Sequence, residues 1–337
     1  MSLALTVVDQ SPVQGLPAGV SPVSLSIELA RACDRLGYHR YWLAEHHNSI
    51  NFAGPCPEIL IGRIAGATEQ IRVGSGGVML THYSPYKVAE QFSMLETLFP
   101  GRIDLGIGRA PGGDALASHA LAYPAQPGLE NYAEQAWLLQ NLLHRTLPED
   151  HPYRNLQVMP GEPAIPETWM LGSSGGSAGL AGQVGMKMCL ALFISPEPAP
   201  PSVISAYKQA WREAGHAGEP QASIAVAALC ADDRAEAEYL AGPAVYWKVM
   251  AFRHGAREVV KNPAEITTLK QQLSPSDRAF YDAVLNSMVL GSADQCAEEI
   301  TRVAGRYQTD EVGIVTVTHD YQHRLRSYQR LAEALIG

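Results

Sequence analysis

Short apolar runs alternate with longer amphipathic segments along the whole chain. A buried run of a few residues followed by a segment of helical spacing is typical of a parallel βα unit. Eight runs are predicted to be strands: 3–8, 38–44, 71–76, 103–108, 168–172, 187–193, 222–230 and 311–318. Eight such units predict an α/β fold that closes into a (β/α)8 TIM barrel. An open, doubly wound sheet is the alternative, because βα alternation alone does not determine closure.

Several helix boundaries can be predicted from local signals. Apolar residues recur every third position from Ile27 to Leu36, and Gly37 then stands where a helix would end. Pro57 and Pro85 each open an apolar segment, and proline is favoured in the first turn of a helix. Helices are therefore predicted to begin at these two prolines.

Two segments are too long for a minimal barrel. Residues 115–127 are rich in Ala, Pro and His, and residues 253–290 are long, polar and weakly patterned. We expect both to be loop insertions on the C-terminal rim, the second of them a mobile lid. The whole chain, 1–337, is predicted to be one domain, since a β/α barrel can absorb this length.

Composition excludes several classes of function. The net charge of −9 argues against nucleic acid or an anionic membrane as the main partner. No apolar run reaches the roughly 18 residues that a membrane span needs, and the first ten residues lack a basic signal-peptide region, so we expect a cytoplasmic protein. The five cysteines are scattered and never in CxxC spacing, so we predict small buried side chains and neither disulfides nor a zinc site.

The second predicted strand ends in three ionisable residues, Glu45, His46 and His47. Successive side chains of a strand point to opposite faces, so His46 can face the barrel axis only if its two neighbours face away. Histidine titrates near neutral pH, which suits proton transfer. His46 is therefore a candidate catalytic residue. The alternative is a histidine that caps a helix or bonds a backbone carbonyl.

The third predicted strand ends in the glycine-rich stretch VGSGGVML. Without side chains, Gly76 and Gly77 would leave a flat surface that a planar ligand or another backbone could approach closely. A glycine-rich bulge that merely turns the chain is an equally good interpretation.

The fourth predicted strand runs into GIGRAPGGD. This stretch differs from a dinucleotide-binding fingerprint because Pro111 occupies the third glycine position. What it offers is Arg109 just past a strand end, where a guanidinium can pair with a phosphate. The alternative is a surface ion pair between Arg109 and Asp104 or Asp114.

The stretch after the fifth predicted strand, LGSSGGSAGLAGQVG, opens a helix of small residues. Exposed N–H groups, hydroxyl donors and the positive end of a helix dipole together favour a phosphate. The candidate ligands are Ser173, Ser174, Gly175, Gly176 and Ser177. An ordinary serine N-cap is the alternative. One such site and one rim arginine indicate a single phosphate, hence FMN rather than a dinucleotide.

These motifs together resemble the bacterial luciferase-like flavin monooxygenases, above all their single-subunit members. The resemblance rests on YWLAEHHN, VGSGGVML, PGRIDLGIGRAPGGD, GSSGGSA and VLGSADQCAEEI, in this order, and covers most of the chain. It implies a barrel, usually paired as a homodimer, that takes reduced FMN from a separate flavin reductase. With O2 it would oxygenate a small organic substrate through a C4a-peroxyflavin.

The resemblance also implies roles for particular residues. His46 would manage protons near the flavin, where the anionic cofactor would raise the pKa of its imidazole. Gly76–Gly77 would be a non-proline cis peptide against the flavin ring. Arg109, Ser174 and Ser177 would contact the phosphate, with Gly175 and Gly176 close by, and residues 253–290 would be the lid.

The sequence departs from luciferase itself at two positions near the flavin. Ser173 and Gly108 replace a glutamate and a cysteine, so light emission is not implied, and a different, larger substrate is expected. Apolar helix faces around Leu60 and Phe92 are a weak indication of dimerisation.

Three other functions are possible. A deazaflavin (F420)-dependent oxidoreductase would need more basic residues than Arg109 alone around its longer acidic tail. A metal-dependent hydrolase could use Glu45, His46 and His47, but the first strand contains no histidine to join them. A non-catalytic flavin-binding protein would need neither His46 nor a lid.

Overall fold

The computed structural model describes residues 3–13, 15, 19–128, 130–162 and 164–337, and its strands close into a barrel. The strands are β1 Ala4–Asp9, β2 Arg40–Leu43, β3 Arg72–Met79, β4 Ile103–Gly108, β5 Glu167–Gly172, β6 Lys187–Ala191, β7 Ala222–Cys230, β8 Val289–Gly291 and β9 Glu311–Val315. All the pairings between them are parallel: β1 to β7 follow in order, and β9 pairs with both β7 and β1. The (β/α)8 barrel prediction is confirmed, and the open sheet is wrong.

The eight predicted strands correspond to the eight strands that close the barrel, with small differences at their ends. The additional strand β8 pairs only with the end of β7, from Ala228 to Cys230. It was not predicted, because three residues carry too little pattern to be distinguished from a loop.

Helices surround the barrel. They are α1 Pro22–Arg35, α2 Pro57–Ala65, α3 Pro85–Leu98, α4 Ala115–Ala122, α5 Tyr132–His144, α6 Gly175–Val184, α7 Ser202–Glu213, α8 Arg234–His254, α9 Pro263–Leu269, α10 Pro275–Asn286, α11 Ala293–Tyr307 and α12 Tyr321–Leu335, with 3-10 turns η1 Leu80–His82 and η2 Lys270–Gln272. As predicted, α2 and α3 begin at their prolines, and Gly37 follows α1 with a φ of +82°.

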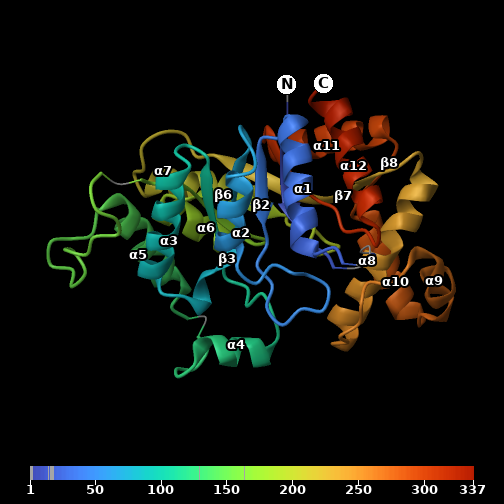
Figure 1. Cartoon of the computed structure of the whole chain (residues 1–337), viewed down its shortest axis with the longest axis horizontal. Helices are drawn as coiled ribbons and strands as arrows, with labels where there is room; N and C mark the ends of the chain where they lie inside the picture. Colours follow the sequence, from blue (N-terminus) through green and yellow to red (C-terminus); the bar gives the residue numbers. More distant parts are fainter. Residues whose placement is uncertain (1–2, 14, 16–18, 129, 163) are drawn as a thin grey trace.

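The insertions lie at one end of the molecule. In Figure 1, α4 is at the lower edge and α9 and α10 are at the lower right, whereas both chain termini are at the top. Residues 263–286 form two helices that pack on α8 around a buried cluster that includes Ile266, Tyr281 and Val284. Their apolar residues face α8 and each other, and this explains why the sequence showed no regular barrel pattern there.

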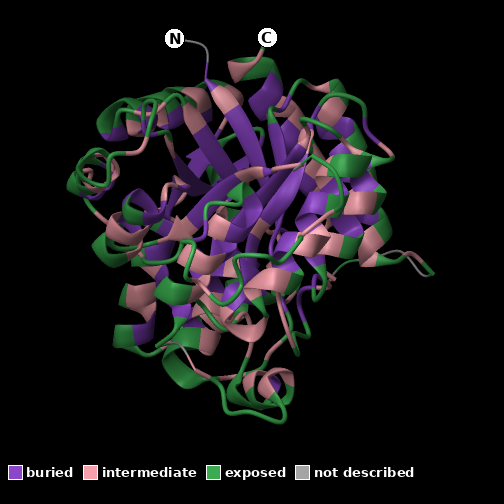
Figure 2. Ribbon diagram, turned by 90° about the vertical axis from the view of Figure 1, so that its left-hand side faces the viewer, coloured by how far each residue is buried: buried purple, intermediate pink, exposed green. Residues whose placement is uncertain are grey.

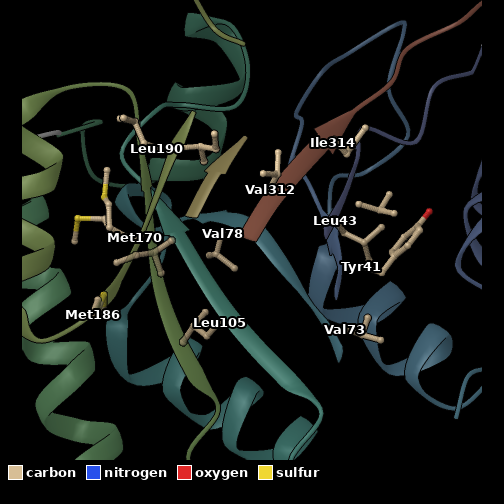
Figure 3. Close-up of a cluster of buried hydrophobic side chains, with 14 of the residues drawn as sticks. Tyr41, Leu43, Val73, Val78, Leu105, Met170, Met186, Leu190, Val312 and Ile314 are labelled. Atoms are coloured by element: carbon tan, nitrogen blue, oxygen red, sulfur yellow. The ribbon is translucent and has the colours of Figure 1, made fainter. Parts of the chain in front are cut away.

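Side chains on the outer face of the barrel form the main core with the helices. In Figure 2 the central strands are mostly buried, and the exposed positions lie on the outer parts of the surrounding elements. Figure 3 shows part of this core, with Tyr41, Leu105, Met170 and Ile314 from four different strands. All four are fully buried. This apolar layer is the largest source of stability in the fold.

The interior of the barrel is layered by strand alternation. Its middle layer is apolar, and the rings of Trp42 and Trp169 meet there edge to face, with 5.2 Å between their centroids. A Cβ on Gly76 would lie only 2.9 Å from the Cβ of Trp42, so β3 needs a glycine at this position. The indole rings therefore close the barrel centre and leave a space above them at the C-terminal rim.

The layer below the indoles is an ion-pair network. Asp104 accepts hydrogen bonds from Arg40 at 2.9 Å, from Arg72 at 2.6 Å and from the Trp42 indole at 2.8 Å. Arg40 also pairs with Glu311 at 2.8 Å. Asp104 is fully buried, so its charge depends on these partners.

Four of the cysteines are buried, as predicted. Cys56, at the N-cap of α2, is exposed, which corrects the prediction of five buried thiols. The residue precedes a helix that starts on the rim, so no layer covers it.

Removing the charge of Asp104 should destabilise the barrel. In Asp104→Asn, Arg40 and Arg72 lose their common carboxylate in a buried site, so the free energy of unfolding should fall by about 3 kcal/mol. Urea unfolding followed by circular dichroism measures it. Asp282→Asn is the matched control, because the Arg278–Asp282 pair is 43% and 46% exposed and should contribute less than about 1 kcal/mol. Equal losses in the two variants would contradict this account of the network.

Candidate functional site

A cavity of about 430 Å³ opens at the C-terminal rim, between the ends of β3, β4, β5 and β6 and the start of α6. We call it the rim cavity. Most of the cofactor-binding residues predicted from the sequence line it: Gly76, Gly77, Arg109, Ser173, Ser174, Gly176 and Ser177. Gly175, the first residue of α6, lies between Ser174 and Gly176. Motifs from three separate strand ends are thus brought to one place.

Gly76 and Gly77 leave part of the β3 wall of the rim cavity without side chains, and Met79 lines the cavity beside them. The Gly76–Gly77 peptide is cis, as the resemblance implied, and the β3–β4 register shifts between Ser75 and Val78. A Cβ on Gly77 would lie 2.7 Å from the carbonyl oxygen of Gly106, so no other residue fits there. Gly108 lines the cavity nearby. The stretch is therefore both a bulge and a flat surface, and the two interpretations of the sequence were not exclusive.

The start of α6 leaves its first amide groups available. Ser174 is extended, with φ −146° and ψ 166°, and its side chain makes no capping hydrogen bond. The Ser177 hydroxyl instead donates to the Ser174 carbonyl oxygen at 2.8 Å. The N–H groups of Gly175, Gly176 and Ser177 have no partner within the helix, and they form the positive end of its dipole. Ser174 therefore occupies the N-cap position without capping the helix through its side chain, and phosphate binding here stays a prediction.

Arg109 is exposed at the edge of the rim cavity. Within the described residues its guanidinium makes no hydrogen bond or salt bridge. Asp104 is held by the barrel network, and Asp114 pairs with Arg257 at 3.1 Å. The surface-pair alternative for Arg109 is thus wrong, and its donors remain available to an anion.

Among the rim-cavity residues that sequence reasoning missed is a polar one, Tyr132, the first residue of α5. Its hydroxyl is buried without a hydrogen-bond partner in the described part of the chain. Burial raises the pKa of this phenol, and the nearby Arg109 opposes the shift. A neutral Tyr132 can donate to an anion beside Arg109. No local motif marked it, since it begins an ordinary amphipathic helix.

His46 borders a second cavity, of about 180 Å³, which also takes residues from α8 and α10. We call it the α8 cavity. The imidazole packs on Phe52, with 4.7 Å between ring centroids, and its Nδ1 is buried without a described partner. Burial, helped by the neighbouring His47, lowers the pKa of His46 to about 4. In the protein alone this is opposite to the upward shift expected from a bound anionic cofactor, because desolvation dominates.

Glu45 and His47 face away from the α8 cavity, as the alternation required. The buried Glu45 carboxylate lies 2.6 Å from His47 Nε2 and accepts hydrogen bonds from the Tyr83 hydroxyl at 2.8 Å and the Met79 amide at 3.1 Å. This network holds the end of β2 to the end of β3. In the described residues, no group of three or more His, Cys, Asp or Glu side chains could hold a metal ion.

The two cavities adjoin. Phe193 and Ile194, just past β6, line both of them. The α8 cavity contains two further polar residues that sequence reasoning missed, Gln10 and Lys248. Gln10 continues the inward alternation of β1 beyond Val8, which could have revealed it. Lys248 is a single cation between Ala244 and Phe252 on one stripe of α8, a weaker signal.

The profile of the luciferase-like monooxygenase family matches residues 3–309. The chain belongs to this family. The resemblance drawn from the motifs is confirmed.

Two relatives in Bacillus subtilis align along almost their whole length. The uncharacterized protein YwcH is 40% identical over 98% of this chain and 99% of its own. An N-acetyl-S-alkylcysteine monooxygenase is 32% identical over 99% of each chain. Among solved structures, apo-MsnO8 has a TM-score of 0.84 at 35% identity and covers 98% of both chains.

More distant structures share the fold. The oxygenating constituent of 3,6-diketocamphane monooxygenase from Pseudomonas putida, in complex with FMN, has a TM-score of 0.74 at 20% identity and covers 99% of this chain and 98% of its own. An F420-dependent secondary alcohol dehydrogenase has a TM-score of 0.70 at 15% identity and covers 99% of both chains. Of the described helices of this luciferase-like monooxygenase, none is long and apolar enough to cross a membrane.

The buried His46 should make stability depend on pH. The unfolded chain binds a proton on His46 near pH 6.5, but the folded protein does so only near pH 4. Stability should therefore fall as the pH drops through this window, by up to about 1.4 kcal/mol per pH unit. Urea unfolding of the ligand-free protein at pH 7, 6 and 5 measures it.

His46→Gln should flatten this pH dependence, whereas His119→Gln, at an exposed position of α4, should leave it unchanged. Equal slopes in the wild type and His46→Gln would show that the imidazole is not held neutral by the fold.

Proposed function

We propose that this chain is an FMN-dependent monooxygenase that uses reduced FMN and O2 to oxygenate a small organic substrate, by the C4a route expected from the sequence. The observation that carries the proposal is the rim cavity, where a flat glycine wall lies beside uncapped amides and an unpaired Arg109. A planar ring and a phosphate are the two parts of a ligand that fit these surfaces. When bound, reduced FMN would supply the electrons that activate O2.

The chain's own residues would hold the two ends of the cofactor. The amides of Gly175, Gly176 and Ser177 would donate to the phosphate oxygens, with Arg109 and Tyr132 on the other side. The Gly76–Gly77 peptide would lie against the ring. Since Phe193 and Ile194 join the two cavities, His46 would lie on the substrate side, where a neutral imidazole can exchange a proton with the reacting groups.

The proposed lid includes the connection from α8 to α9, residues 255–262. Arg257 donates to the Asn48 carbonyl oxygen at 2.7 Å, and the Val260 amide donates to the Asn51 side chain at 2.9 Å. The connection is thereby tied to the loop that follows His46. A segment tied to this loop can cover the site and exclude water during the reaction.

FMN is favoured over F420 by charge. Arg109 is the single basic residue among the described residues of the rim cavity. One phosphate needs no further basic residue, whereas the longer acidic tail of the deazaflavin would need several. A purely flavin-binding role would not require the α8 cavity and its buried imidazole.

We also propose a separate flavin reductase as the source of reduced FMN, and a homodimer. Leu60 and Phe92 belong to the buried core, so they are not the dimer surface that the sequence indicated. The exposed apolar side chains of α2 and α3 are instead Ile59, Met94 and Leu98. Light scattering should give twice the chain mass of 36.4 kDa, and a mass of one chain would contradict the dimer.

Arg109→Ala should weaken FMN binding by about 10- to 100-fold, since a hydrogen bond to a charged group contributes about 1.5–3 kcal/mol. Riboflavin lacks the phosphate, so its affinity should not change. Flavin fluorescence titration measures both ligands. Arg212→Ala, with a side chain that is 65% exposed on α7, is the control. An unchanged FMN affinity in Arg109→Ala would mean that the phosphate lies elsewhere.

Turnover tests the whole proposal. With a flavin reductase, NADH, FMN and ¹⁸O2, the protein should transfer one labelled oxygen atom to its substrate, measured by mass spectrometry. N-acetyl-S-alkylcysteines are the first substrates to try, since a relative carries that name. His46→Ala should keep FMN binding and lose at least 100-fold in turnover. Full turnover in this variant would show that His46 has no role in the reaction. Binding of F420 in preference to FMN would overturn the proposal as a whole.

A further inference from the structure

The α8 cavity has an apolar body with a charge at one side. Its lining is mainly aromatic and aliphatic, with Phe52, Trp247 and Phe252 around it and Val317 at the barrel side. The ring planes of Phe52 and Trp247 are perpendicular, with 5.4 Å between centroids. A cavity of this kind takes a small ligand that is mostly hydrocarbon.

Lys248 supplies the charge. Its ammonium donates one hydrogen bond, to the Phe193 carbonyl oxygen at 2.7 Å, and it forms no ion pair with any carboxylate of the described residues. Two of its three donors therefore have no acceptor in the part of the chain that the structure describes. Burial without a counter-charge lowers the pKa of Lys248 to about 8, so most of the amine is still charged at neutral pH.

A partly buried ammonium without a counter-charge is unfavourable unless something compensates it. The Phe193 carbonyl offers a partial charge only, and a methionine could fill the same volume without that cost. His46 also lines this cavity, and its buried Nδ1 has no hydrogen-bond partner among the described residues. An ammonium with donors to spare in an otherwise apolar cavity indicates a missing ligand with an acceptor at a defined position.

We propose that the α8 cavity binds the organic substrate and selects a small amphipathic acid, whose carboxylate pairs with Lys248 while its alkyl or aryl part fills the apolar body. This inference rests on the proposed function, since it names the substrate class of that site. Lys248 donates a hydrogen bond to the carbonyl oxygen of Phe193, which also lines the rim cavity. The carboxylate of the acid would therefore lie at the junction of the two cavities. The rest of the molecule would lie beside His46.

A matched pair of probes tests this selection. Octanoate and octanamide share an alkyl chain and differ in charge, and their binding to the protein with and without FMN can be measured by calorimetry and by tryptophan fluorescence. Octanoate should bind the wild type at least 10-fold more tightly than octanamide. Lys248→Met should remove this preference by weakening octanoate alone. Lys87→Met, whose side chain is 64% exposed on α3, should change neither affinity.

The outcomes are separable. Three outcomes would overturn the inference. The wild type could bind the two probes with equal affinity, Lys248→Met could weaken the binding of both probes equally, or neither probe could bind. FMN affinity, measured on the same proteins, reports on the proposed function independently: an absent FMN site with octanoate preference intact would refute that function and leave the acid site standing.

A second measurement covers the case in which Lys248→Met does not fold. In the wild type, octanoate affinity should fall above about pH 8, because the lysine loses its proton there while the acid stays ionised. Octanamide affinity should stay constant. His46 is the other titratable residue among the described residues of this cavity, and its pKa of about 4 keeps it neutral throughout. Octanoate affinity that does not change up to pH 10 would overturn the inference.

Discussion

The packing of two indole rings inside the barrel determines where the site can be. Trp42 and Trp169 fill the middle of the barrel edge to face, above a buried network in which Asp104 pairs with both Arg40 and Arg72. Bulk of this size is accommodated because β3 carries a glycine where its backbone approaches Trp42. Below the rings the interior is lined by charged side chains that pair with one another. Above them, the space at the carboxyl ends of the strands remains open to a ligand.

That open space has two chemically distinct halves. The rim cavity presents backbone amides, a guanidinium and a bare peptide surface, which suit an anion joined to a planar ring. The α8 cavity presents hydrocarbon, a neutral imidazole and an ammonium. Strand alternation separates the two histidines at the end of β2: His47 is used with Glu45 to hold β2 to β3, and His46 is left to the cavity. In the proposed reaction, one half binds the cofactor and the other the substrate.

The sequence predicted the fold well where a regular period was present. The eight staves of the barrel and the starts of α2 and α3 follow from buried runs, prolines and glycines, which act locally. The predictions failed where an element shows no regular period, or where packing alone decides which side of a helix is buried. Strand β8 is too short to show a period, α9 and α10 bury their apolar residues against α8, and Leu60 and Phe92 face inward although their helices were thought to show an outer apolar face.

The sequence alone was enough to predict which chemical groups stand at the strand ends. A flat, phosphorylated ligand was indicated by the glycines at 76 and 77, the guanidinium at 109, and the serines and glycines at the start of α6. These groups have the same binding preferences in any fold that exposes them. Tertiary structure decided the rest. Barrel closure brings Lys248 near His46 and Tyr132 near Arg109, although about 200 and about 20 residues separate them. It also decides burial, which keeps His46 neutral; desolvation depends on the surrounding elements and leaves no trace in local sequence.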